Sequence, residues 1–268
     1  MAKLRVATGI EIHYERIGSG PALLLIMGTG LDHTCWDAQI DAYSGEFECI
    51  AFDNRGTGKT DAGVEPLSTQ LMADDAAALL DALGVVRAHV SGLSLGSCVA
   101  QQLALQRPDL VGTLQLHGTW ARAHGYAARK FQAQIRLLEM LDLRSFYEIN
   151  VLWFLTPQFM QKYPDRLARQ IDTIVAAAPS KELLQQQYAA DLNHDTFDRL
   201  NQIRVPTLVT VGSFDVALPT MYSREVAAAI PDAELVIFEE GGHLHNVEQP
   251  DEFNRVTLEF LRRYTGMD

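Results

Sequence analysis

Hydrophobic and polar residues follow one another along this chain in blocks of two kinds. Short aliphatic runs with little polar interruption are typical of buried parallel strands, and they occur at 22–27, 47–52, 87–92, 110–118, 207–212 and 233–239. Segments with helical spacing of apolar residues lie between most of them, at 68–84, 96–110, 220–230 and 250–266. The stretch 7–18 indicates an antiparallel arm at the sheet edge. Alternating strands and helices predict an α/β fold, a mainly parallel sheet with helices on both faces.

One region interrupts this alternation. Residues 120–200 contain no clear strand pattern, but they contain helical patterns at 127–142 and 181–193 and an aromatic stretch at 146–160. We therefore expect a core domain made of residues 1–119 and 201–268, and a helical cap made of residues 120–200 that lies over the strand ends.

Composition and charge limit the function classes. Hydrophobic residues make up 47% of the 268 positions and the net charge is -12, and the absence of a Lys/Arg-rich run disfavours nucleic acid as a partner. The apolar runs are too short to span a bilayer, and the N-terminal stretch lacks a signal core. Cys35, Cys49 and Cys98 lack metal-site spacing and are interpreted as reduced core thiols. These features favour a cytoplasmic protein with no membrane partner, a monomer or homodimer acting on a small molecule.

A short glycine-flanked motif joins one strand to the helix that follows it. Gly92 and Gly96 stand two positions before and after Ser94, which is the Gly-x-Ser-x-Gly pattern of a nucleophile elbow. Such an elbow holds a serine in a strained turn, and the flanking positions must be small to avoid collision. The spacing predicts that Ser94 is a nucleophile at a helix N-terminus, where developing negative charge is favoured.

A serine hydroxyl needs a base, and the elbow motif places an acid and then a histidine later in the chain. Asp215 follows the strand 207–212, and His243 follows the last strand. The order Ser94, Asp215, His243 is the one that the motif requires. His245 competes for the role of the base, but the Gly-Gly pair before His243 suits a tight approach. A His-x-His metal site lacks a third ligand nearby, so we expect no metal.

The oxyanion formed during acyl transfer needs two backbone donors. The residue after the nucleophile, Leu95, should supply one N–H group, and Thr29 in the loop after the strand 22–27 should supply the other. Gly28 and Gly30 flank Thr29 and allow close approach to a substrate.

Two glycine-rich segments resemble nucleotide-binding motifs without completing them. The segment 28–30 begins like Gly-x-Gly-x-x-Gly, but the third glycine position is His33, and no helix with clean apolar spacing is expected to follow. The segment 55–60 ends like a phosphate-binding loop, but the required first glycine is Asp53. We therefore expect no nucleotide cofactor.

The chain resembles the α/β-hydrolase superfamily in four segments that occur in the family's order, namely 52–61, 92–96, 213–219 and 241–254. The resemblance implies the α/β-hydrolase fold, with an eight-stranded, mainly parallel sheet and a helical cap, and it implies structural roles for Asp53 and Arg55. The segments 24–40 and 80–97 look most like the esterase and 3-oxoadipate enol-lactonase branch. One departure is Met27, which stands where the family usually has histidine, so the packing of the oxyanion loop must differ.

These features predict a serine hydrolase that cleaves an ester or lactone with an apolar moiety through an acyl-enzyme, without cofactors. A carbon–carbon bond hydrolase, an aminopeptidase or thioesterase, and a non-catalytic ligand receptor are the alternatives. An aminopeptidase would need acidic cap residues such as Glu139, Asp142 and Glu148. The expected substrate pocket is apolar and is lined by Met27, Trp120, Trp153, Phe154, Leu218 and Leu244.

Overall fold

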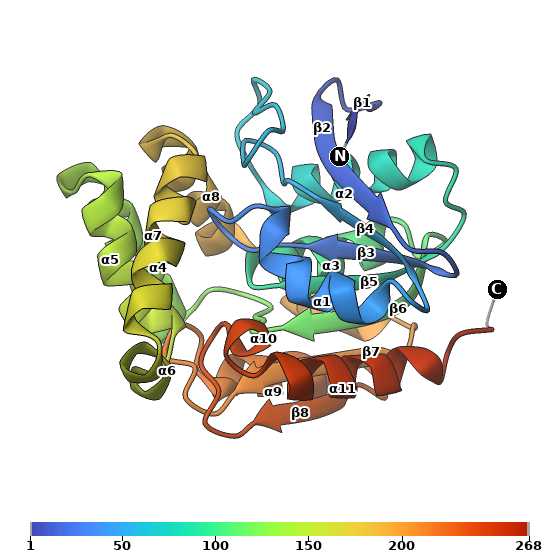
Figure 1. The fold of residues 1–268 in the computed structure, drawn as a ribbon. Helices are drawn as coiled ribbons and strands as arrows, with labels where there is room; N and C mark the ends of the chain where they lie inside the picture. Colours follow the sequence, from blue (N-terminus) through green and yellow to red (C-terminus); the bar gives the residue numbers. More distant parts are fainter. Residues whose placement is uncertain (1, 267–268) are drawn as a thin grey trace.

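A single twisted sheet organises the chain (Figure 1). The computed structural model describes residues 2–266. The sheet has eight strands in the order β1-β2-β4-β3-β5-β6-β7-β8, and only the pairs β1–β2 and β2–β4 are antiparallel. The strands are β1 (Ala2–Arg5), β2 (Glu11–Ile17), β3 (Ala22–Ile26), β4 (Glu48–Phe52), β5 (Ala88–Leu93), β6 (Val111–His117), β7 (Thr207–Gly212) and β8 (Glu234–Phe238). The α/β-hydrolase-type sheet with an antiparallel edge is thus confirmed.

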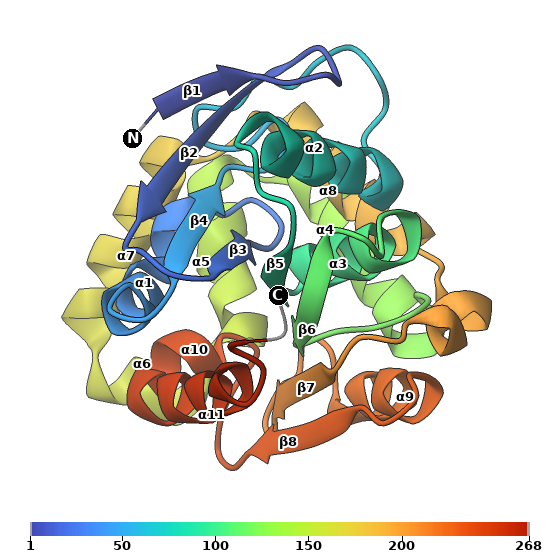
Figure 2. The same ribbon diagram turned by 90° about the vertical axis from the view of Figure 1, so that its right-hand side faces the viewer.

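Helices cover both faces of the sheet because successive strand residues point to opposite sides. Leu24 and Ile26 of β3 pack in one apolar cluster with α2 (Thr69–Ala82), α3 (Leu95–Gln106) and α9 (Thr220–Ala229). Leu23 and Leu25 pack in a second cluster with α1 (Asp37–Tyr43) and α11 (Pro250–Arg262). Figure 2 shows these two helical layers on either side of the sheet.

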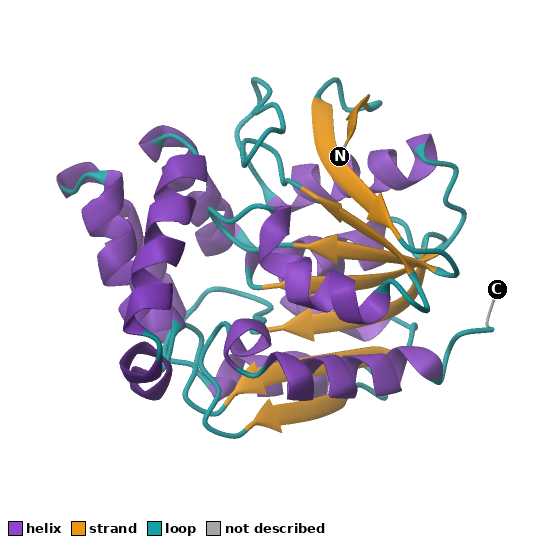
Figure 3. Ribbon diagram, in the orientation of Figure 1, coloured by secondary structure: helices purple, strands orange, loops and turns teal. Residues whose placement is uncertain are grey.

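A group of helices lies beyond the carboxyl ends of the parallel strands, to which the arrowheads point in Figure 3. We call this group the cap, and it comprises α4 (Gly125–Met140), α5 (Leu143–Phe154), α6 (Pro157–Lys162), α7 (Pro164–Ala177) and α8 (Lys181–Asn193). A third apolar cluster joins the cap to Cys98, Leu218 and Tyr222 of the core. The cap therefore lies over the carboxyl ends of the parallel strands, where β5, β7 and β8 lead into their loops.

A short helix follows β3, although the sequence shows no helix with clean apolar spacing there. A 3₁₀ turn, η1 (His33–Trp36), leads into the short helix α1, and a second 3₁₀ turn, η2 (Phe197–Gln202), follows the cap. Helix α1 has only seven residues and buries Gln39, Ile40 and Tyr43, which is too short an apolar stripe to stand out in the sequence. A short helix, α10 (His245–Glu248), likewise precedes α11.

Two further findings concern membrane-spanning helices and the cysteines. Within residues 2–266 no helix is long and apolar enough to cross a membrane. Cys49 and Cys98 are buried free thiols, as the sequence suggested, and Cys35 is a half-buried free thiol.

Candidate active site

Ser94 lies at the junction of β5 and α3. Its φ of 54° and ψ of -123° fall in a region that residues with a Cβ rarely adopt and that costs roughly 1–3 kcal/mol. A Cβ atom on Gly92 would overlap the carbonyl oxygen of Gly96, and a Cβ atom on Gly96 would overlap that of Ile26. The turn therefore requires glycine at both flanking positions, and it leaves Ser94 half-buried at the start of α3.

Asp215 and His243 meet in the loops after β7 and β8. Nδ1 of His243 lies 2.8 Å from Oδ2 of Asp215, and the other carboxylate oxygen accepts a bond of 2.7 Å from the N–H of Leu218. Because a carboxylate only accepts, Nδ1 carries a proton, and in the neutral imidazole the lone pair is then on Nε2. Nε2 is buried and has no hydrogen-bond partner among residues 2–266. The ring stacks on Phe154 of the cap at 5.5 Å between centroids.

His245 has a separate environment. Its Nε2 lies 2.8 Å from Oγ1 of Thr210, and its Nδ1 lies 3.2 Å from the carbonyl oxygen of His243. Burial lowers the pKa of His245 to about 4, so it is neutral at pH 7. The geometry thus pairs His243, and not His245, with Asp215.

The loop after β3 approaches Ser94 closely. A Cβ atom on Gly28 would lie 3.0 Å from Cβ of Ser94. The N–H groups of Thr29 and Leu95, expected as oxyanion donors, donate no hydrogen bond to any described residue. Both groups are therefore available to a ligand.

Cap residues fix the loop after β3, the predicted oxyanion loop, in place. Gln187 of α8 accepts a bond of 2.8 Å from the N–H of Gly30 and donates one of 2.7 Å to Thr57. The Tyr147 hydroxyl donates to the carbonyl oxygen of Gly30 at 3.2 Å. These contacts hold a loop in which Met27 occupies the position usual for histidine.

A small cavity of about 20 Å³ brings the predicted nucleophile and base to one place. Ser94, Thr29 and His243 line it, together with residues of the cap and of the adjoining loops. The hydroxyl of Ser94 and Nε2 of His243 are not hydrogen-bonded to each other, and such bonds often tighten only when substrate binds. The other residues that line the small cavity are Gly28, Leu31, Leu93, Lys130, Phe131, Phe154, Tyr188, Asp191 and Leu244.

Lys130 of α4 and Asp191 of α8 give this cavity an unexpected polar end. Asp191 is 1% exposed and Lys130 is 7% exposed. Oδ2 of Asp191 accepts a bond of 2.7 Å from the Thr29 hydroxyl, whereas Oδ1 is buried without a partner among the described residues. The Lys130 ammonium lies 4.7 Å from the ring centroid of Phe131 and 5.3 Å from that of Phe154.

Burial and mutual attraction act in opposite directions on this pair of charges. Burial lowers the pKa of Lys130, and the negative charge of Asp191 opposes that change. Burial raises the pKa of Asp191, and the Thr29 hydrogen bond and the Lys130 charge oppose it. Each charge therefore helps to keep the other ionised.

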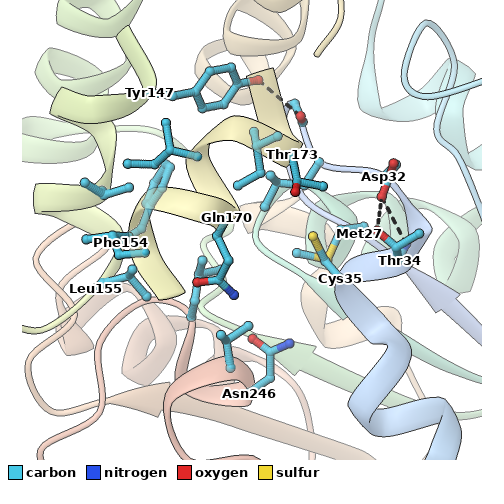
Figure 4. A pocket seen from close by; sticks show the side chains of 18 of the residues that line it. Met27, Asp32, Thr34, Cys35, Tyr147, Phe154, Leu155, Gln170, Thr173 and Asn246 are labelled. Carbon is cyan, nitrogen blue, oxygen red and sulfur yellow. Dashed lines mark hydrogen bonds between the residues drawn. The ribbon is translucent and has the colours of Figure 1, made fainter. Parts of the chain in front are cut away.

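A larger pocket of about 470 Å³ adjoins the small cavity (Figure 4), and this volume is in the range of small-molecule sites. Thr29, Leu31, Phe154 and Leu244 line both spaces. The outer walls come from α5 and α7 and are mostly apolar, with Val151, Leu155, Leu167, Ile171 and Ile174 among them.

The predicted pocket residues divide into two groups. Met27, Phe154 and Leu244 line the larger pocket. The other three line neither cavity. Trp120 packs against Phe131 with tilted rings, 5.2 Å between centroids, and donates to the backbone of Asp191. Leu218 is fully buried in the cap cluster, and Trp153 is half-buried on α5 outside both cavities.

The three cap acids considered for an aminopeptidase also lie outside both cavities. Glu139 is exposed, Asp142 accepts from Ser145 as the N-cap of α5, and Glu148 lies 3.6 Å from Arg144. Asp142 therefore caps a helix and Glu148 forms an exposed ion pair, and neither they nor Glu139 lie where a substrate amino group would bind.

Asp53 organises a buried cluster away from the cavity. It lies 3.0 Å from Nδ1 of His13 and 2.6 Å from Nδ1 of His33, and it accepts from the N–H of Lys59. Burial opposes its ionisation, yet the bonds from His33 and Lys59 hold the pKa of Asp53 below its usual range. The three side chains lie close enough together to face a metal ion, but each imidazole is bonded to Asp53, and the cluster ties β2 and η1 to the loop after β4.

The chain matches a family described as "alpha/beta hydrolase fold" over residues 21–250. It therefore belongs to the α/β-hydrolase family and is a hydrolase of that fold, as the four sequence segments implied.

Among its relatives is the "Putative carbamate hydrolase RutD" of Azorhizobium caulinodans, 32% identical over 250 residues that cover 93% of this chain and 94% of the relative. Among solved structures, the enol-lactonase from Burkholderia xenovorans is 26% identical, with a TM-score of 0.90 over 97% of this chain and all of the other. A thermophilic esterase from Thermogutta terrifontis is 28% identical, with a TM-score of 0.87 over 98% of both chains.

Proposed function

We propose that the chain is a serine hydrolase that cleaves an ester-type bond through an acyl-enzyme on Ser94. The observation that carries the proposal is the buried, unpartnered Nε2 of His243, which lines the same cavity as the half-buried Ser94. The names of its relatives cover a carbamate, an enol-lactone and an ester, which share a carbonyl carbon bonded to a leaving oxygen.

In this mechanism His243 removes the proton of Ser94 as its oxygen attacks the carbonyl carbon. Asp215 holds the imidazole by the 2.8 Å bond at Nδ1 and stabilises its cation. The free N–H groups of Thr29 and Leu95 stabilise the oxyanion. His243 then protonates the leaving alcohol and activates the water that releases the acid.

The two adjoining cavities suggest which part of the substrate binds where. The small cavity beside Ser94 holds the acyl group, and the larger, mostly apolar pocket holds the leaving alcohol or the ring of a lactone. This arrangement agrees with a substrate that has an apolar moiety. Within the mechanism, the shared residues Phe154 and Leu244 contact both parts.

The test is hydrolysis of phenyl acetate and of a lactone panel by the Ser94→Ala variant. We expect kcat/KM to fall by about 10⁴-fold or more, because removal of the nucleophile leaves only binding and oxyanion contributions. A fluorophosphonate probe should label the unaltered chain and not the variant. Ser44→Ala, a half-buried serine outside both cavities, is the matched control.

Full activity or labelling of the Ser94→Ala variant would contradict the proposal. Cleavage of a vinylogous diketone without cleavage of phenyl acetate would instead assign the site to carbon–carbon bond hydrolysis.

A further inference from the structure

A row of buried polar side chains crosses three neighbouring strands of the sheet and ends at the loop of the predicted base. Ser91 comes from β5, His117 from β6 and Thr210 from β7, which lie side by side in the sheet (Figure 2). His245 follows at the start of α10. We call these four residues the polar row. Each is at most 1% exposed, and the proposed Ser94 mechanism uses none of them.

Hydrogen-bond distances connect the polar row from end to end. Oγ of Ser91 lies 3.0 Å from Nε2 of His117, and Nδ1 of His117 lies 2.7 Å from Oγ1 of Thr210. The same Thr210 hydroxyl lies 2.8 Å from Nε2 of His245. The row ends where Nδ1 of His245 lies 3.2 Å from the carbonyl oxygen of His243. It therefore links β5, which leads into the nucleophile elbow, to the backbone of the predicted base.

The carbonyl oxygen at the end of the row fixes which atom donates in every bond. A carbonyl group only accepts, so Nδ1 of His245 carries a proton, and in the neutral ring Nε2 accepts from Thr210. The Thr210 oxygen then accepts from Nδ1 of His117, whose Nε2 accepts from the Ser91 hydroxyl. Burial lowers the pKa of both imidazoles, which keeps them neutral at pH 7. Every ring nitrogen in the row thus has a partner of the right kind.

The need to fill space does not explain the row. The rings of Trp36, Phe238 and Phe253 pack around its two imidazoles, with centroids 4.7 to 6.2 Å away. Apolar side chains would suit these surroundings, because a buried polar group costs free energy unless it is hydrogen-bonded. A fully bonded network instead specifies a single arrangement of its members. The row therefore suggests that the orientation of the group at its end matters for function.

The group at the end of the row is the backbone of His243. The N–H of Gly242 donates to Glu248 at 3.0 Å, and this bond acts on the preceding residue. The bond from His245 acts on His243 itself, on the other side of its Cα. Because the polar row starts on β5, this bond ties the position of the base to the strand that leads into the nucleophile.

We propose that His245 is a positioning residue, which donates from Nδ1 to the carbonyl oxygen of His243 and so sets the distance between Nε2 of that base and the hydroxyl of Ser94. The rest of the polar row holds His245 in the required tautomer. This inference rests on the proposed function and goes beyond its three reacting residues. Misplacement of a reacting group by about 1 Å can cost about 100-fold in rate, so loss of the row should lower kcat more than it changes KM.

The first test locates the protons without any substrate. In nitrogen NMR spectra of the isotopically labelled histidines at pH 7, His245 should carry its proton on Nδ1 and have an unprotonated Nε2. Its two signals are assigned by their loss in His245→Asn. A proton on Nε2 and none on Nδ1 would leave the His243 carbonyl group without its donor, and this result overturns the inference.

The second test compares His245→Asn with His245→Leu, two side chains of nearly the same size and shape. Asparagine places an N–H group near the position of Nδ1, and leucine cannot donate. We expect His245→Leu to lower kcat for phenyl acetate at least about tenfold and to change KM less than about twofold. His245→Asn should retain kcat within about threefold, because it keeps a donor of about 1 kcal/mol. End-point labelling by a fluorophosphonate counts intact sites, so kcat is expressed per labelled site.

The third test acts one residue further along the row, and it decides the question if His245→Leu does not fold. Thr210→Val keeps the side-chain shape and removes the hydroxyl, so kcat per labelled site should fall about threefold or more. Thr210→Ser keeps a hydroxyl and should restore most of it. Thr113→Val is the matched control, because it removes a buried hydroxyl 2.8 Å from Nδ1 of His89, near the start of β5 and β6.

The outcomes separate this inference from the proposed function. Equal kcat per labelled site in His245→Asn and His245→Leu, or in Thr210→Val and Thr113→Val, overturns the positioning role and leaves the serine mechanism intact. Absence of Ser94-dependent hydrolysis and labelling in the unaltered chain contradicts the serine mechanism itself. The NMR test then still decides whether His245 donates to the His243 carbonyl group.

Discussion

At the scale of a single residue, Gly96 determines how closely α3 approaches β3. A Cβ atom there would overlap the carbonyl oxygen and carbon of Ile26, and backbone atoms cannot move aside as a flexible side chain can. We expect Gly96→Ala to lower the free energy of unfolding by about 3 kcal/mol or more, measured by urea denaturation. The end of β3 leads into the oxyanion loop, so hydrolysis of phenyl acetate should fall as well.

Gly45 provides the matched control, because a Cβ atom there would meet nothing within 4 Å and its φ is not positive. Gly45→Ala should leave stability and activity near those of the unaltered chain. Equal stability of the two alanine variants would show that the elbow tolerates a side chain at position 96.

Some residues of the candidate site can be predicted from sequence patterns, and others cannot. The glycine spacing around Ser94 and the strand-end positions of Asp215 and His243 are local patterns with a physical cause, so sequence alone singles them out, and the catalytic roles of these three stay a prediction. Lys130, Asp191 and Gln187 lie on cap helices, where a charged or polar residue also suits an exposed face. Only the packing of α4 and α8 over Ser94 distinguishes them.

At the scale of elements, Arg55 joins the loop after β4 to helix α2. Its Nε and Nη2 donate to Asp75 at 2.7 and 2.6 Å, and both side chains are 1% exposed. Removing Asp75 leaves the buried Arg55 charge with only the exposed Glu65, 3.7 Å away, as an acidic neighbour. We expect Asp75→Asn to lower the free energy of unfolding by about 3 kcal/mol, measured by urea denaturation followed by circular dichroism.

Asp74, the preceding residue on the same helix, is exposed, so Asp74→Asn should have little effect. The double variant Arg55→Met/Asp75→Leu should be more stable than Asp75→Asn, because it removes both charges. A loss below about 1 kcal/mol in Asp75→Asn would mean that the ion pair adds little to the attachment of α2.

The parallel strands and the longer core helices follow from the hydrophobic pattern because each buries a continuous run or stripe. Short elements are less visible. Helix α1 and the turn η1 follow the oxyanion loop directly, and polar Asp37, Gln39 and Asp41 interrupt their apolar residues. The arrangement of the cap helices depends on long-range contacts such as the Tyr147–Gly30 bond, which no local pattern encodes.

At the scale of the whole molecule, several histidine side chains are buried as neutral imidazoles inside the fold. His194, which follows α8, lies 3.0 Å from the Thr69 hydroxyl and 3.3 Å from Oε1 of Gln101. Burial lowers its pKa to about 3. His117 and His245 are likewise buried, and burial lowers the pKa of each. Folding therefore holds these histidines neutral in acid that would protonate them in the unfolded chain.

This difference fixes the sign of the acid response. Below about pH 6.5 the unfolded chain binds a proton at each of these histidines while the folded chain does not. The free energy of unfolding therefore decreases as the pH falls from about 6.5 towards the folded pKa. The slope is up to about 1.4 kcal/mol per pH unit for each histidine.

We expect His194→Gln to reduce this acid sensitivity. Between pH 7 and pH 5, the loss of unfolding free energy should be smaller in the variant by about 2 kcal/mol, one proton over 1.5 pH units. Urea denaturation at each pH measures it, and groups that titrate in both proteins cancel in the difference. His124→Gln, at an exposed histidine, is the control. Parallel stability curves for the unaltered chain and His194→Gln would show that His194 binds its proton equally well in the folded state.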